Sequence, residues 1–362
     1  MTQGNYDPRI SPDPFRPQGS QPPKPNSSKT LLIVLGSLLG GLAVLVLLCC
    51  GGLYYVTRMP APSPAARQPF DLATTPIPEF PERAPPEEFL PGVDLYTVRI
   101  TGETGGHYSP AGNGGAIFVY LPAGDHQPKS LPCVLITGAG TNLLEGVEFE
   151  DIEFEEDAAE HLPYVKAGMA VVVYEMDGSY YEDEYGNELE EQMFHDFQAA
   201  GAGMVNARNA FEFTLQRFPE INPEQIYTAG HSSAGTAALL FAAHESRIAG
   251  AVAYAPCADV EHLHPTLAVR GLAARYPGLI DFLCQSSPTT HHERIRCPVF
   301  LFQSEADTTV EAKHTRNFAD LLRQHNSHVT LQTVGHGDHY NSMIDQGIPA
   351  GIEWLKQQQA GK

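Results

Sequence analysis

The chain has 362 residues and a formal net charge of −21 at pH 7. Nucleic-acid binding needs clustered lysine and arginine side chains, so this charge argues against a nucleic acid as partner. Six cysteines are too few for a disulfide scaffold, and whether Cys257 and Cys284 pair in an oxidising compartment stays open.

The first 57 residues predict a tail followed by a membrane anchor. Residues 1–29 are rich in proline and poor in apolar side chains, which indicates disorder. Residues 30–57 carry no charge, and their apolar part, Leu31–Val56, reaches about 39 Å as a helix, enough to cross a hydrocarbon core of about 30 Å. A cleaved signal peptide is the alternative, but its apolar region spans only about 7–15 residues and ends in an Ala-x-Ala-like site, which is absent here. We therefore predict one uncleaved transmembrane helix, with membrane contact through residues 31–56.

The charges that flank this helix predict its orientation. Arg16, Lys24 and Lys29 precede it, whereas Arg58 and Arg67 follow it. Positive charge concentrates on the cytoplasmic side of membrane proteins. We therefore expect a cytoplasmic N-terminus, with the large C-terminal part outside the cytoplasm.

Residues 58–92 are again proline-rich and predict an extended stalk, and residues 93–362 are the length of one α/β domain. Several of its strand candidates are continuous apolar runs, as in parallel sheets that are buried on both faces. The alternation of strands and helices predicts an open, mostly parallel sheet with helices on both faces. The strand candidates are Leu95–Ile100, Ala116–Leu121, Cys133–Thr137, Ala170–Tyr174, Ile226–Ala229, Gly250–Ala255, Pro298–Phe302 and His328–Val334, and the helix candidates are Glu155–Lys166, Glu191–Arg217, Ser233–Glu245, Glu311–Gln324 and Pro349–Gln358.

The segment Ile226–Phe241 combines a β-prone run, a turn of small residues and an apolar helix. A serine in such a turn is held at a sharp strand-to-helix corner, which is the nucleophile elbow of serine hydrolases. Ser232 fits best, because Gly230 and Ala234 lie two positions to either side and backbones pass closely there. The usual pattern Gly-x-Ser-x-Gly is changed, since its second glycine stands one position later, at Gly235. A helix N-cap serine is the alternative interpretation.

A serine nucleophile needs a histidine base and an acid that orients the histidine. Asp307 follows a predicted buried strand, with Glu305 as a second candidate, although an aspartate there also suits a helix N-cap. His339, in the loop after the last strand, is the predicted base, and His336 in the same loop is the alternative. These residues follow the chain order Ser, acid, His that is typical of one hydrolase fold.

Acyl transfer also requires hydrogen-bond donors for the oxyanion. The amide of Ser233 follows the nucleophile and is the first candidate. The glycine-rich loop after Cys133–Thr137 supplies the second, from Ala139 or Gly140. This loop is not a phosphate-binding P-loop, because it lacks the required lysine.

These motifs resemble the α/β-hydrolase superfamily, most closely the dienelactone hydrolases and the catalytic domains of prolyl oligopeptidases. The resemblance covers roughly Leu95 to Leu355 and rests on the Ser232 elbow and on the Asp307 and His339 loops. It implies an eight-stranded sheet, Ser232 as nucleophile and hydrolysis of an ester, amide or peptide. Dienelactone hydrolases have a cysteine nucleophile, and prolyl oligopeptidases carry a large β-propeller for which 362 residues leave no room, so neither substrate is transferred.

Residues 256–296 contain no clear strand, and the resemblance to α/β-hydrolases implies that they form a cap over the site. They hold His262, His264, His291 and His292, which invite a zinc assignment. No supporting Cys-x-x-Cys or His-Glu-x-x-His pattern accompanies them, so neither a metal site nor a cofactor is predicted.

The sequence as a whole predicts a membrane-anchored serine hydrolase that cleaves a small ester or amide through an acyl-enzyme intermediate. A peptidase of the prolyl-oligopeptidase type and a catalytically silent binding protein with the same fold are the alternatives. The expected partner is a small ester, amide or peptide, and the oligomeric state is left open.

Overall fold

The computed structural model describes residues 62–100, 115–149, 158–179, 187–261 and 266–360. Residues 62–362 form one compact unit. Within the described residues no helix is long and apolar enough to cross a bilayer. The predicted tail, 1–29, and the predicted transmembrane helix, 30–57, lie outside the described residues.

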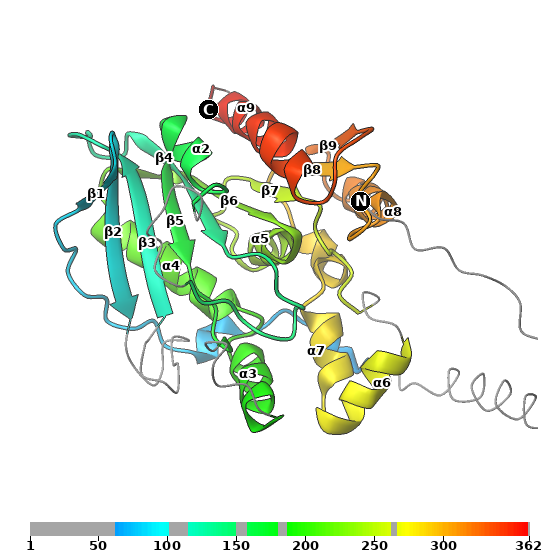
Figure 1. Cartoon of the computed structure of the whole chain (residues 1–362). Coiled ribbons are helices and arrows are strands. Elements are labelled where there is room, and N and C mark those ends of the chain that lie inside the picture. Colours follow the sequence, from blue (N-terminus) through cyan, green and yellow to red (C-terminus); the bar gives the residue numbers. More distant parts are fainter. Residues whose placement is uncertain (1–61, 101–114, 150–157, 180–186, 262–265, 361–362) are drawn as a thin grey trace, which may run out of the picture. The chain divides into compact units, whose positions relative to one another are not determined.

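Nine strands of the described part form one twisted sheet in the order β1-β2-β3-β5-β4-β6-β7-β8-β9 (Figure 1). The first strands pair antiparallel up to the β3–β5 contact, and all later neighbours are parallel. About eight strands were expected from the sequence, and the additional one, β1, is short and carries two exposed glutamates. The strands are β1 Glu87–Leu90, β2 Val93–Ile100, β3 Gly115–Pro122, β4 Leu131–Thr137, β5 Ala170–Tyr174, β6 Ile221–His231, β7 Ala251–Tyr254, β8 Val299–Ser304 and β9 Val329–Val334.

The helices lie on both faces of the sheet. On one face α2 and α9 pack over alternate strand residues such as Val171, Val173 and Phe300, and on the other α4 and α5 pack together beside α8. Every residue of β5 is buried, which explains its continuous apolar run. The helices are α2 Leu162–Lys166, α3 Asn187–Ala199, α4 Met204–Arg217, α5 Ser232–His244, α6 Thr266–Arg275, α7 Leu279–Gln285, α8 Ala312–Arg323 and α9 Ile348–Ala360, with short turns η1 Pro64–Arg67, η2 Leu72–Thr74, η4 Pro288–Arg294 and η5 Met343–Gly347.

Two helix predictions were wrong in extent. The predicted single helix Glu191–Arg217 is broken into α3 and α4, because Gly201, Ala202 and Gly203 all have positive φ angles. Such angles do not continue a right-handed helix. The predicted helix Glu155–Lys166 is described only as α2, which begins at Leu162 after a turn.

Residues 62–86, for which we predicted an extended stalk, lie along the folded domain (the blue segment in Figure 1). Phe80 is 3% exposed and its ring packs 5.6 Å from that of Phe213 on α4. Arg208, also on α4, donates hydrogen bonds to the carbonyl oxygens of Leu72 and Thr75. A proline-rich segment forms little helix or sheet, so many of its carbonyl oxygens lack regular backbone donors. Arginine side chains of α4 supply the donors instead.

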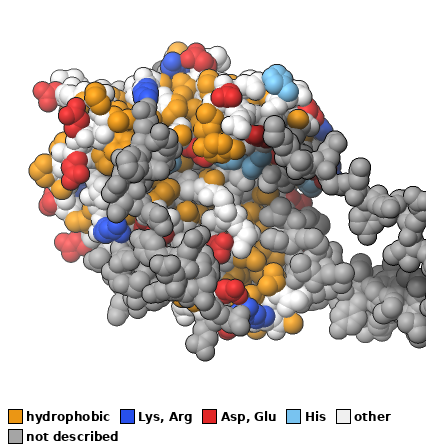
Figure 2. Space-filling model, viewed as in Figure 1, with side chains coloured by type: hydrophobic (Ala, Val, Ile, Leu, Met, Phe, Trp, Pro, Cys, Tyr) orange, Lys and Arg blue, Asp and Glu red, His pale blue; other side chains and the backbone are white. Residues whose placement is uncertain are grey.

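The 256–296 segment, predicted as a cap, contains α6, α7 and η4. Its aromatic residues contact α3, since Phe194 lies 4.8 Å from Tyr276 and Phe197 lies 5.8 Å from Phe282 between ring centroids. Figure 2 shows acidic side chains spread over this view of the surface with few basic ones among them, in keeping with the net charge of −21.

Candidate active site

Ser232 stands at the corner between β6 and α5. The strand ends at His231, the helix begins at Ser232, and the φ angle of Ser232 is +52°. A positive φ strains a residue that has a Cβ, and such strain persists where the surrounding structure enforces it. The corner thereby places a half-buried serine at the carboxyl end of a central strand.

The small residues around Ser232 are required by backbone contact. A Cβ added at Gly230 would lie 2.4 Å from the Ala234 backbone, and one at Gly235 would lie 2.9 Å from the Gly230 carbonyl oxygen. Ala234 itself is fully buried, so its methyl group fits. The shifted glycine of this motif is therefore explained, because position 235 is the one that faces the preceding strand.

Asp307 and His339 come together from the loops after β8 and β9. The Asp307 Oδ2 atom lies 2.7 Å from Nδ1 of His339. The other oxygen, Oδ1, accepts hydrogen bonds from the Thr309 and Val310 amides at 2.8 and 2.9 Å. Burial by itself would raise the pKa of Asp307, but the hydrogen bonds from His339 and these amides outweigh it and lower that pKa. Asp307 is thus an anionic partner for the imidazole.

The second nitrogen of His339, Nε2, is buried and has no hydrogen-bond partner among the described residues. An imidazole whose Nδ1 donates to a carboxylate has a lone pair on Nε2, as a general base needs. In a free enzyme the hydrogen bonds between catalytic residues are often long or poorly aligned, and they shorten in the substrate complex.

The alternative acid and base are placed elsewhere. His336 is exposed at the surface. Glu305 is also exposed and forms an ion pair with Arg316. The structure therefore brings Asp307 and His339 together and leaves Glu305 and His336 outside this contact.

The loop after β4, which holds the predicted oxyanion donors Ala139 and Gly140, reaches the first turn of α5. The Thr141 amide donates to Oγ of Ser233 at 3.2 Å. Gly140 has a φ angle of +95°, which only glycine adopts without strain. The Ser233 amide lies in the first turn of α5, where helix N–H groups lack intrahelical acceptors. The loop that contains Ala139 and Gly140 therefore contacts Ser233, the residue after Ser232.

Two ionisable residues that the sequence analysis missed adjoin the histidine. His231 Nε2 lies 3.0 Å from the His339 carbonyl oxygen, and its Nδ1 lies 3.9 Å from Oε1 of Glu160. Burial, with the adjoining His339, lowers the pKa of His231 to about 4. Burial raises the pKa of Glu160 to about 7, although attraction to His339 opposes this. His231 is adjacent to Ser232 in sequence, whereas nothing in the sequence pointed to Glu160.

A small apolar pocket adjoins this loop and α5. Its free volume, about 10 Å³, is roughly that of one water-sized group. It is lined by Leu143, Met176, Phe197, Ala202, Ser233, Thr236, Ala237, Leu240 and Ser286. Ser233, the residue after Ser232, forms one of its polar edges.

All four cysteines that the structure describes, Cys133, Cys257, Cys284 and Cys297, are free. Cys257 and Cys284 are therefore not joined to each other. Of the four histidines considered for zinc, His291 is buried with Nε2 2.8 Å from the Gln285 carbonyl oxygen, and His262 and His264 lie outside the described residues.

The sequence matches one protein family, and the fold is similar to that of several solved structures. The model of the prolyl oligopeptidase family matches residues 157–359. No curated protein matches the sequence. Among solved structures, an acetyl xylan esterase from Paenibacillus sp. R4 matches with a TM-score of 0.54 and 16% identity, over 78% of this chain and 90% of the esterase.

Two peptidase structures are similar over a smaller part of their length. The acylaminoacyl peptidase of Pyrococcus horikoshii matches with a TM-score of 0.53 and 12% identity, over 74% of this chain and 40% of the peptidase. A structure from a study of two prolyl endopeptidases matches with a TM-score of 0.52 and 18% identity, over 74% of this chain and 38% of that protein. At these identities the likeness is one of fold.

Proposed function

Because the chain belongs to the prolyl oligopeptidase family, a family of serine hydrolases, we propose that it cleaves a small ester or amide with Ser232, His339 and Asp307 as its catalytic triad. The observation that carries the assignment is the 2.7 Å contact between Asp307 and His339 at the carboxyl end of the sheet, beside the strained Ser232 corner. Each of the three residues follows a different strand, as hydrolysis by this fold requires.

In the proposed reaction, Ser232 Oγ attacks the substrate carbonyl carbon while His339 Nε2 takes the hydroxyl proton. The tetrahedral oxyanion accepts hydrogen bonds from the Ser233 amide and from Ala139 or Gly140. Collapse of this intermediate breaks the bond to the alcohol or amine, which leaves with the proton from His339 Nε2. Water, deprotonated by His339, then attacks the acyl-enzyme and releases the acid.

We infer a small acyl group and an ester rather than a peptide. The apolar pocket that Ser233 helps to line is small, and we assign it to the acyl group because Ser233 follows Ser232. The matched esterase corresponds to this chain over 90% of its length, whereas the peptidases exceed the matched region more than twofold. A peptidase activity is the second candidate, and the family name alone favours it.

The decisive experiment treats the full chain with a fluorophosphonate probe, which labels activated serines. We expect labelling of the parent and of Ser233→Ala, whose backbone amide is retained, and none of Ser232→Ala. Labelling that persists in Ser232→Ala would refute Ser232 as the nucleophile. A folded parent that is not labelled would favour the binding-protein alternative.

We also propose that residues 31–56 anchor the chain in a membrane, with the N-terminus in the cytoplasm and the hydrolase domain on the opposite side. The apolar length of the segment and the flanking charges support this. When a membrane fraction is extracted with alkaline carbonate, the chain should stay in the membrane pellet. Its release into the supernatant would contradict the anchor. External protease should digest the domain in intact cells, and protection there would contradict the orientation.

A further inference from the structure

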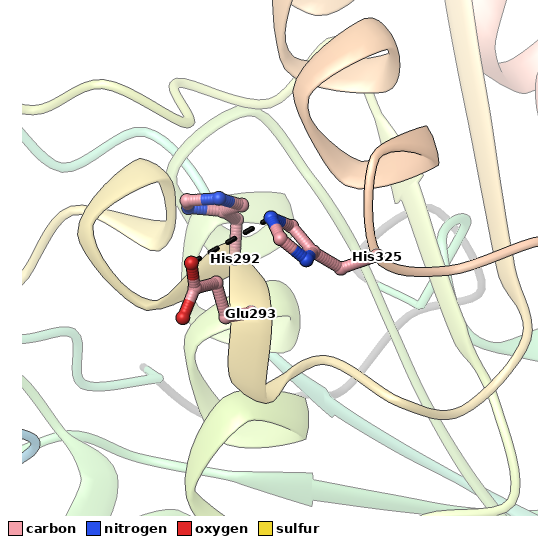
Figure 3. A group of neighbouring side chains, drawn as sticks. All are labelled: His292, Glu293 and His325. Atoms are coloured by element: carbon pink, nitrogen blue, oxygen red, sulfur yellow. Dashed lines mark ion pairs between the residues drawn. The ribbon is translucent and has the colours of Figure 1, made fainter.

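Outside the active site, two imidazoles and a carboxylate converge at one point of the surface. His292 and Glu293 lie on η4, and His325 lies in the turn that follows α8 (Figure 3). One ligand atom from each residue lies within 4.8 Å of the other two, and this is the one such group found among the described residues.

The separation of the donor atoms suits a metal ion better than a direct contact. Nε2 of His325 lies 3.6 Å from Oε1 of Glu293, which is too long for a hydrogen bond. Two ligands of a tetrahedral zinc ion, each about 2.1 Å from the metal, are about 3.4 Å apart. The Glu293–His325 pair therefore already has the spacing of one edge of a zinc site.

The backbone orients His292 as a ligand. Its Nδ1 lies 2.8 Å from the carbonyl oxygen of Thr289, to which it donates. Metal-binding histidines usually donate their second N–H in this way, because the bond fixes the tautomer and leaves a lone pair on the other nitrogen. The lone pair of His292 is then on Nε2. The ring centroids of His292 and His325 are 5.3 Å apart.

The two segments that carry the ligands are already joined. Nδ2 of Asn326 donates to the carbonyl oxygens of Ile295 and Cys297 at 3.0 and 2.7 Å. These residues lie near the ligands in the chain, since Asn326 follows His325 and Ile295 follows the last residue of η4. The site is therefore held in place before a metal binds, which reduces the cost of binding.

We propose that His292, Glu293 and His325 bind a divalent transition-metal ion, zinc foremost, with water as a fourth ligand. Imidazole and carboxylate ligands suit zinc in a tetrahedral site. The ion links η4, which precedes β8, to the end of α8, which precedes β9. Both segments enter the amino ends of their strands, whereas Ser232, Asp307 and His339 follow carboxyl ends. The metal is therefore a structural cross-link at the opposite end of the strands from the hydrolytic residues.

The test measures zinc binding to the metal-stripped full chain by isothermal titration calorimetry. We expect one zinc ion per chain, with an affinity that falls at least tenfold in His292→Gln, in Glu293→Gln and in His325→Gln. His195→Gln is the matched control and should bind as the parent does. That residue forms an exposed pair with Glu191 at 3.8 Å but is not part of a three-ligand group.

A second readout separates this site from loss of folding and from the active site. Zinc should raise the melting temperature of the parent, of His195→Gln and of the Ser232→Ala variant, but not that of His325→Gln, whose exposed side chain is not needed for folding. Absence of binding to the parent would overturn the proposal, as would equal binding to a His292→Gln, His325→Gln double variant. Failure of the proposed hydrolysis would leave zinc binding unchanged, so the two ideas fail independently.

Discussion

At the scale of single residues, the orientation of His339 depends on one carboxylate. Asp307 is held by amides of its own loop and contacts Nδ1 of His339 at 2.7 Å. If the carboxylate is replaced by an amide, the imidazole loses both its orientation and the charge that stabilises its protonated form.

We therefore expect Asp307→Asn to lower kcat on a chromogenic acetate ester about 10⁴-fold with the fold intact. Glu305→Gln, two residues away and exposed, should retain parental activity. Steady-state kinetics and circular dichroism check both variants, and a loss confined to Glu305→Gln would transfer the acid role to that residue.

Glu160 is predicted to contribute through His339. Its pKa is raised to about 7, so the side chain becomes anionic as the pH rises through neutrality, and the anion favours the protonated imidazole of the transition state. Glu160→Gln should therefore lower kcat about threefold to tenfold above pH 8, while the two enzymes converge below pH 6, where parental Glu160 is neutral. The measurement is kcat against pH for both enzymes, and a constant ratio across the range would exclude this role.

At the scale of elements, the sequence predicted the strands and three of the five helices well, and the extent of the other two helices poorly. Apolar runs such as Ala170–Tyr174 are read from composition alone because both faces of a central strand are buried. The break between α3 and α4 places Ala202, a good helix former, at a positive φ angle between Gly201 and Gly203. The two glycines are a local signal for the break that the prediction of a single helix did not use.

The proline-rich segment 62–86 is an element whose docking can be measured. Phe80 is 3% exposed, whereas Ile77 in the same segment is 48% exposed. Phe80→Ala should lower the free energy of unfolding by about 3–5 kcal/mol, and Ile77→Ala should change it by less than about 0.5 kcal/mol. Urea denaturation measures both, and equal small effects would mean that the segment is a free stalk in solution.

At the scale of the whole molecule, burial lowers the pKa of some histidines and raises the pKa of some carboxyl groups. The pKa values of His161, His231 and His244 are lowered by burial to about 4, and those of Glu160 and Glu175 are raised by burial to about 7. Between about pH 6.5 and 4.5 the unfolded chain protonates these histidines while the folded chain protonates the carboxyl groups. The two effects on stability oppose each other.

Replacement of one of these carboxyl groups should make its contribution to the pH dependence of stability measurable. Glu175 accepts hydrogen bonds from the Ala116 and Phe149 amides, and its raised pKa means that its contribution to stability is present below about pH 4.5 and is lost as the pH rises to about 7. The stability deficit of Glu175→Gln relative to the parent should therefore grow by about 1.4 kcal/mol for each pH unit of acidification from 7 to 4.5. Denaturant unfolding at several pH values measures this, and a deficit independent of pH would contradict the raised pKa.

What the sequence by itself determined were features that depend on neighbours along the chain. The buried strands follow from runs of apolar residues, and the corner at Ser232 follows from the small residues at Gly230 and Gly235, because backbone contact acts within a few positions. The order of serine, aspartate and histidine is likewise a property of the chain. These features were enough to predict the fold and the serine hydrolase.

Only the tertiary structure decided which side chains meet across long separations. It placed His339 rather than His336 against Asp307, brought Glu160 to the same histidine and set His325 beside His292 instead of the histidines nearest in sequence. Such contacts depend on strand register and on the path of each loop, and no local pattern encodes them. A shift of a few residues along a loop would place a different histidine against Asp307. The position of each histidine therefore depends on the folded backbone.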